Sequence, residues 1–218
     1  SRDNLLWIPL TGDLTKNFSA FKTDLISKQI AVSVTKASAP ITERWSSTGG
    51  IEWQGKAPND RTNFERIYVD QDFVATAGLK LIYGRDMDLA KYPSDSTAVL
   101  LNERALEIMN FKNPIGEIIH DSGREWHVIG VVKDFVFTSP YRMIEPIVLY
   151  GSKAHWAFGV VHVRLNPALP VADAIDMLGQ TETKYNPDYP FEYHFTDYDY
   201  QRKFDDLRTT LKITTVFT

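Results

Sequence analysis

The side chains that bind transition metals are few in this chain and poorly spaced for the task. Its five histidines lie at positions 120, 127, 155, 162 and 194, and it has no cysteine. No two histidines have the four-residue helical spacing of a zinc-binding pair, and no thiolate can complete a tetrahedral site. The sequence therefore predicts packed or surface histidines and no bound metal.

Four carboxylates gather near the C-terminal end, where they flank a predicted amphipathic helix. They are Asp197, Asp199, Asp205 and Asp206. Such groups can serve as paired acids and bases or as calcium ligands. Their spacing lacks the alternating oxygen ligands and the closing glutamate of a calcium loop, and a carboxylate near a helix start is stabilised by the helix dipole. Capping and solvation therefore explain these aspartates better than catalysis does.

Two short motifs resemble parts of catalytic sites but lack the partners that such sites need. Thr48-Gly49-Gly50 is not followed by the Gly-Lys-Ser/Thr of a phosphate-binding loop. Lys133-Asp134 follows an apolar strand, where turn hydrogen bonds and a surface ion pair account for it. A Gly-x-Ser-x-Gly motif is also missing. We therefore predict a protein that is not an enzyme and binds no cofactor.

Composition and charge limit the classes of protein and of binding partner that remain. An apolar fraction of 43% with 12% aromatics predicts a folded globular chain, whose 218 residues suffice for one large or two small domains. The net charge of −4 disfavours nucleic acids and anionic membrane surfaces as partners. No stretch reaches the ~20 apolar residues that cross a bilayer, so we expect the chain as given to be soluble.

Three tryptophans, which we expect to be exposed, are the better functional candidates. Trp45 and Trp53 lie in or beside a long polar segment, and Trp156 lies between two predicted strands. Tryptophan often anchors interfaces, because it loses little side-chain entropy for the area that it buries. The alternative is that these side chains fill the seam between two subdomains.

Apolar periodicity predicts the order strand, helix, strand near both ends of the chain. In the first helix, Leu14, Phe18 and Phe21 belong to one stripe with a 3.6-residue period. The strands and helices of the two units cover residues 5–10, 14–25, 30–35, 160–165, 171–185 and 191–195. Two such units, separated by more than a hundred residues, favour a split duplication that packs as one helix-on-sheet layer.

The middle of the chain predicts a compact α+β unit of its own. Asn102 is a good N-cap for a short helix that buries Ala105, and Asn110 closes that helix. The strands and helix of this unit cover residues 98–101, 103–109, 126–132 and 146–150. Between residues 37 and 60, an excess of serine, threonine, glycine and proline indicates a long loop or crossover.

Several short motifs follow one another in a fixed order. They are Gly49-Gly50-Ile51-Glu52-Trp53, Gly84-Arg85, Leu101-Asn102-Glu103, Asn113-Pro114-Ile115-Gly116 and Gly130-Val131-Val132-Lys133-Asp134-Phe135. On these motifs the chain, from Leu5 to about Leu211, resembles the extracytoplasmic core domain of MacB-like and FtsX-like ABC transporter permeases, particularly those typical of Bacteroidetes.

The resemblance implies an α+β fold with two subdomains. A porter-like subdomain, built of the two strand-helix-strand units, would comprise residues 1–68 and 152–211. A smaller α+β subdomain would be inserted as residues 69–151. Residues 212–218, which turn apolar and β-branched, would begin a truncated membrane helix.

The function implied by the resemblance is non-catalytic. Such a domain lies on the periplasmic side of the inner membrane and transmits ATP-driven conformational change, in export or in lipoprotein handling. Its partners would be a second permease protomer, a cytoplasmic ATPase reached through the membrane helices, and a periplasmic adaptor, with no nucleic acid. The alternative is a periplasmic ligand-binding or sensory module for a peptide, lipid or antibiotic. A hydrolase is a third reading, without a specific motif behind it.

Overall fold

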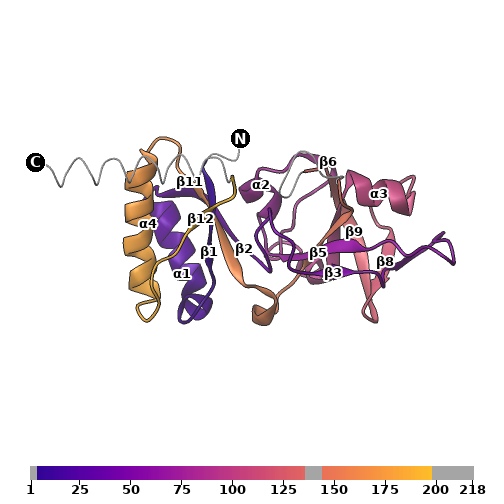
Figure 1. The fold of residues 1–218 in the computed structure, drawn as a ribbon, viewed down its shortest axis with the longest axis horizontal. Coiled ribbons are helices and arrows are strands. Elements are labelled where there is room, and N and C mark those ends of the chain that lie inside the picture. Colours follow the sequence, from indigo (N-terminus) through magenta and orange to yellow (C-terminus); the bar gives the residue numbers. More distant parts are fainter. Residues whose placement is uncertain (1–3, 136–143, 198–218) are drawn as a thin grey trace, which may run out of the picture.

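A computed structural model describes residues 4–135 and 144–197 of the chain, and its strands form one mixed sheet. The strand order is β12-β1-β11-β2-β5-β10-β7-β9-β8-β4, with β3 paired to β5 and β6 paired to β9. Helices cover the sheet at both of its ends (Figure 1). The predicted α+β class is confirmed.

One end of the sheet carries the two long helices, and we call it the helical half. It comprises β1 (Leu5–Pro9), α1 (Leu14–Ser27), β2 (Ala31–Ala37), β11 (Val160–Leu165), α4 (Val171–Tyr185) and β12 (His194–Phe195). Both predicted strand-helix-strand units are therefore present, although the last strand, predicted over residues 191–195, is only the two residues of β12. Figure 1 shows them interleaved, since the strands of each unit pair with those of the other and α1 lies beside α4.

The other end contains the middle of the chain, and we call it the α3 half. Its strands are β3 (Ser47–Thr48), β4 (Glu52–Trp53), β5 (Phe64–Val69), β6 (Leu81–Gly84), β7 (Ala98–Asn102), β8 (Ile118–Asp121), β9 (Arg124–Val132) and β10 (Ile147–Gly151). Its helices are α3 (Glu103–Met109) and the 3-10 turn η1 (Pro93–Thr97). A second 3-10 turn, η2 (His155–Ala157), and the short helix α2 (Phe73–Ala77) lie between the two halves (Figure 1).

Three clusters of buried side chains explain how this sheet is stabilised. One cluster fills a single face of the sheet across both halves and includes Leu5, Ala37, Val69 and Leu149. On the opposite face the apolar side chains form two clusters, one under α1 and α4 and one beside α3. The alternation of side chains along a strand produces this division, because neighbouring residues point to opposite faces. The two halves therefore share a core on one face only.

The helix predicted at residues 103–109 begins and ends as expected. The Oδ1 atom of Asn102 accepts a hydrogen bond from the backbone N–H of Ala105 over 3.0 Å. Asn110 closes the helix in the left-handed conformation, with φ of 55°. The N-cap and C-cap predictions for α3 are both confirmed.

Some predictions differ from the structure or lie outside it. The segment from 37 to 60 contains the two short strands β3 and β4, which pair with β5 and β8, and is therefore not a plain loop. The predicted helix containing Phe204, Leu207 and Leu211, the aspartates at 199, 205 and 206, and the membrane-helix start at 212–218 lie outside the described residues. The division into subdomains with a boundary at residue 68 stays a prediction.

Candidate functional site at the junction of the two halves

The sheet narrows to a single ladder pair where the two halves meet. Strands β2 and β5 share only the pair of Ala37 with Val69, whereas β1 and β11 share five pairs. Beside this pair, Ser38 donates its backbone N–H to the Tyr68 carbonyl over 2.9 Å, and Asp70 donates to the Lys36 carbonyl over 3.1 Å. The halves are therefore joined through a much shorter ladder than the one that holds the helical half together.

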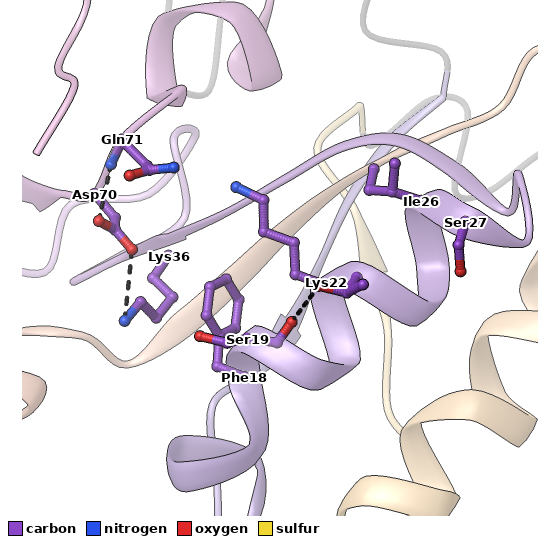
Figure 2. Close-up of a pocket in the computed structure, with 9 residues that line it drawn as sticks. Phe18, Ser19, Lys22, Ile26, Ser27, Lys36, Asp70 and Gln71 are labelled. Atoms are coloured by element: carbon purple, nitrogen blue, oxygen red, sulfur yellow. Dashed lines mark hydrogen bonds and ion pairs between the residues drawn. The ribbon is translucent and has the colours of Figure 1, made fainter. Parts of the chain in front are cut away.

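A groove lies over this junction, on the face where the buried clusters are separate. Its volume is about 520 Å³. Phe18, Lys22 and Ile26 of α1 form one wall, and Lys36 and Asp70 lie opposite them (Figure 2). The helical period places the three α1 side chains on one face, because they are four residues apart.

Two lysines of the groove are paired with aspartates of the turn between β5 and α2. Lys36 Nζ lies 3.5 Å from an Asp70 oxygen and packs over the rings of Phe18 and Phe158, at 4.8 and 4.7 Å from their centroids. On the other wall, Lys22 Nζ lies 3.2 Å from Asp72. Each positive charge is therefore balanced within the groove, and two aromatic faces add cation–π attraction for Lys36.

No motif predicts this groove, because its members come from separate elements. The strand-like run that contains Lys36 is otherwise apolar or small, and a charge in such a run is the one available signal. The aspartates at 70 and 72 resemble ordinary loop residues in the sequence. Only the path of the chain after β5 brings them to α1.

The three candidate tryptophans separate into two classes. Trp53 is only 7% exposed and packs edge-to-face on Phe64, so the expectation of an exposed side chain is wrong for it. Trp45 is 52% exposed and Trp156 is 79% exposed. Trp45 contacts the edge of Trp7, and its indole N–H donates to Glu43 over 2.8 Å. The interface role of Trp45, Trp53 and Trp156 stays a prediction.

The described histidines are not arranged to bind a metal. Among residues 4–135 and 144–197, no group of three or more histidine or acidic side chains could hold an ion. His162 is fully buried, and its Nε2 accepts the backbone N–H of Ile41 over 3.0 Å. Burial lowers the pKa of His162 to about 3, so the ring is neutral at physiological pH. His194 stacks on Trp7 with centroids 4.2 Å apart.

Two of the sequence motifs meet in space and join β7, β9, β10 and α3. Asp134 accepts hydrogen bonds from Asn102 Nδ2 and from the Arg104 backbone N–H, over 2.8 and 2.9 Å. Asn102 also donates to the Glu145 carbonyl and accepts from Ile147, each over 2.8 Å. The sequence predicts turn hydrogen bonds for Asp134, but its carboxylate instead bonds to residues at the start of α3. Burial raises the pKa of Asp134.

A buried carboxylate that no sequence motif marks lies beside these strands. Asp95 has no exposed surface, and Arg85 pairs with both of its oxygens at 2.6 and 2.7 Å. Its Oδ2 also accepts the backbone N–H of Asp88 over 2.9 Å. Burial alone would raise the pKa of Asp95, but the bonds from Arg85 and Asp88 outweigh it and hold this pKa low. This ion pair fixes the Gly84-Arg85 motif, so that motif is structural.

Among the described residues no helix is both long enough and apolar enough to cross a membrane. No protein-family model matches the sequence, and no curated protein matches it. The periplasmic region of MacB from Actinobacillus actinomycetemcomitans has a similar structure, with a TM-score of 0.62 and 17% sequence identity. The match covers 96% of this chain and 92% of that one.

Two further solved structures are similar. The extracellular domain of the noncanonic ABC-type transporter YknZ from Gram-positive bacteria matches at a TM-score of 0.55 and 15% identity, over 87% of this chain and 97% of that one. A domain described as part of a permease protein of Porphyromonas gingivalis matches at 0.54 and 14%, over 88% and 89%. The chain therefore has the fold of the MacB-like periplasmic core domain, as its motifs imply.

Proposed function

We propose that this chain is the extracytoplasmic domain of an ABC transporter permease, placed on the periplasmic side of the inner membrane. The shared fold carries the proposal, because it extends over 96% of this chain and 92% of the MacB periplasmic region. The two other neighbours are also named as parts of a transporter or a permease. The proposed role is non-catalytic, with a second permease protomer, a cytoplasmic ATPase and a periplasmic adaptor as partners.

The strand arrangement supports a mechanical role. The first strand, β1, pairs with the last described strand, β12, and the backbone N–H of Thr196 donates to the Leu5 carbonyl over 3.0 Å. The chain therefore enters and leaves the described fold at one point. In the proposed permease, the segments that lead to the two membrane helices would leave the described fold side by side, and a tilt of either helix would act on β1 and β12 together.

The rest of the sheet offers a path for that movement. From β1 it passes through β11 and β2, reaches the junction of Ala37 with Val69, and continues into β5 and β10. In the proposed mechanism, closure of the ATPases tilts the membrane helices and moves this domain against its twin. The cargo would be an exported substrate or a lipoprotein.

The test uses the full-length permease that contains this chain, reconstituted with its ATPase. This chain has no cysteine, so once any cysteine outside it has been replaced, single cysteines at the exposed positions Ala172 of α4 and Lys112 after α3 can carry spin labels. We expect the distance between protomers to change at both positions when ATP binds. Distances that stay the same with and without ATP would overturn the mechanical proposal.

The groove favours a second candidate function, a ligand-binding or sensory module. A volume of about 520 Å³ falls in the range of small-molecule sites, and Lys22 and Lys36 lie beside the apolar surface of Phe18 and Ile26. Calorimetric titration of the chain with peptides, lipids and antibiotics tests this reading. Micromolar binding that Ile26→Asp abolishes would favour it, and no heat of binding would eliminate it.

A further inference from the structure

The segment from Asp70 to Ala77 passes around the free part of the β2 edge. Strand β5 leaves its ladder with β2 after Val69, and the chain then runs past β2 into α2. This segment contacts both faces of β2. Asp72 pairs with Lys22 of α1 on one face, while Gln71 and Thr76 reach side chains on the other.

Polar contacts fasten this segment to the helical half at several points. The Thr35 hydroxyl donates to the Gln71 carbonyl over 2.7 Å. The Ser33 and Thr76 hydroxyls share a short hydrogen bond. On the next strand, Arg164 Nε donates to the Thr76 carbonyl over 2.8 Å. Strands β2 and β11 and helix α1 therefore all hold the segment from Asp70 to Ala77.

The same segment is also fastened to the α3 half. Asp86 Oδ2 accepts the backbone N–H of Ala75 over 3.2 Å, and the Asp72 N–H donates to the Met87 carbonyl over 3.3 Å. Phe73 belongs to the buried cluster that both halves share, and its ring meets His162 of β11 edge-to-face at 5.6 Å. Polar and apolar contacts therefore join residues 70–77 to the helical half and to the α3 half.

We propose that residues 70–77 form a clasp that couples the two halves into one cooperative unit. A single ladder pair resists rotation of one half against the other poorly, because β2 and β5 separate directly after Ala37 and Val69. Contacts on both faces of β2 remove that freedom, since turning either way stretches one set of them. The consequence for transport rests on the proposed function, but the coupling itself does not.

Native-state hydrogen exchange of the 218-residue chain tests the clasp without any transport assay. In the unchanged chain we expect the slowest amides of β11 and of β9 to exchange at the rate of global unfolding, as one unit. The double variant Lys22→Met with Thr76→Val removes the ion pair with Asp72 and both hydrogen bonds of the Thr76 hydroxyl, to Ser33 and to the Asp72 carbonyl. We expect the ratio of the slowest exchange rates in the two halves to change by about tenfold.

A matched control removes similar contacts away from the clasp. Lys16→Met, also on α1, removes an ion pair with the N-cap residue Asp13. Thr183→Val removes a hydroxyl bond to the Gly179 carbonyl of α4. This control should leave the ratio unchanged. Equal acceleration in both halves of the clasp variant, or no change, would overturn the proposal. If the double variant does not fold, Ser33→Ala is measured by the same criterion.

The result separates the two proposals. If the slowest exchange rates of the two halves become different in the clasp variant, the clasp is supported whatever the chain does in a membrane. Fixed distances in the full-length permease would overturn the mechanical role while leaving the clasp intact. Conversely, a permease that moves on ATP binding, together with equal acceleration of exchange in both halves of the clasp variant, would retain the function and lose the clasp.

Discussion

Thr196 is bonded twice to the carbonyl oxygen of Leu5, by its backbone N–H over 3.0 Å and by its hydroxyl over 3.1 Å. These bonds close the sheet where the first and last described strands meet. They also set the spacing of the two chain segments that would continue toward a membrane. Replacing the hydroxyl therefore tests how firmly the two segments are held.

Thr196→Val should lower the free energy of unfolding by about 1 kcal/mol, because it removes one buried hydrogen bond and keeps the side-chain shape. Urea unfolding followed by circular dichroism measures the change. Thr183→Val is the comparison, since its hydroxyl bonds to the helix backbone at an exposed position. Equal losses in the two variants would contradict a special role for the Thr196 hydroxyl.

Asp95→Asn should cost about 3 kcal/mol, the lower end for a broken buried ion pair, because Arg85 is partly open to water. Since the pKa of Asp95 is held low, its contribution is present at neutral pH and is lost as the pH falls below about 4. Urea unfolding at pH 7 and at pH 3.5 measures both effects. The exposed Glu107→Gln, which loses an ion pair with Arg104, should change stability by less than about 0.5 kcal/mol.

Asp86 should make stability depend on pH in the opposite direction. Burial raises its pKa to about 6, against the bonds from the Ala75 and Met87 backbone. Its contribution is full below about pH 4 and is lost as the pH rises through 6. The side chain of Asp86→Asn stays neutral at every pH. Between pH 4 and 7 the unchanged chain should therefore lose about 2 kcal/mol of unfolding free energy relative to this variant, and its melting temperature should fall relative to that of the variant.

The comparison for Asp86 is the difference in melting temperature between the two chains, measured at several pH values in one buffer series. A difference that stays constant across the pH series would contradict the raised pKa of Asp86.

Alanine substitutions at two glycines with positive φ distinguish the cost of backbone strain from the cost of a steric clash. A Cβ on Gly84 would lie 2.0 Å from the Ile129 carbonyl oxygen, whereas a Cβ on Gly55 would meet nothing within 4 Å. Gly55→Ala should cost about 1 kcal/mol from its left-handed conformation. Gly84→Ala should cost at least twice as much, because β6 must also move away from β9. Similar melting temperatures for both variants would contradict the close approach of these strands.

The helical half follows closely from local patterns. Leu14, Phe18, Phe21 and Leu25 are all buried on the predicted face of α1.

In the α3 half, the cap of α3 also follows from local sequence. Asn102 caps this helix because its short amide can reach the helix backbone, and that contact depends on neighbouring residues alone. Predictions of this kind succeed because the interaction partners lie within one turn of the chain.

The junction could not be derived in the same way. Lys22 and Asp72 are fifty positions apart in the sequence and meet only because the chain passes around β2 after Val69. The short strands β3 and β4 also depend on distant partners, since two residues have no periodicity to detect. The polar segment around Trp53 predicts an exposed side chain, but its ring packs on Phe64.

The order of the strands in the sheet also bears on the order in which the polypeptide is made. Strands β3 to β10 form from one continuous stretch, Ser47 to Gly151, so the α3 half can assemble as soon as that stretch has emerged. By contrast, Leu5 must wait for Arg164, and Leu6 for Phe195, before β1 has neighbours on both sides. Until synthesis reaches those residues, the apolar segment that forms β1 has neither of its partner strands. During that time the fold itself does not protect this segment from aggregation.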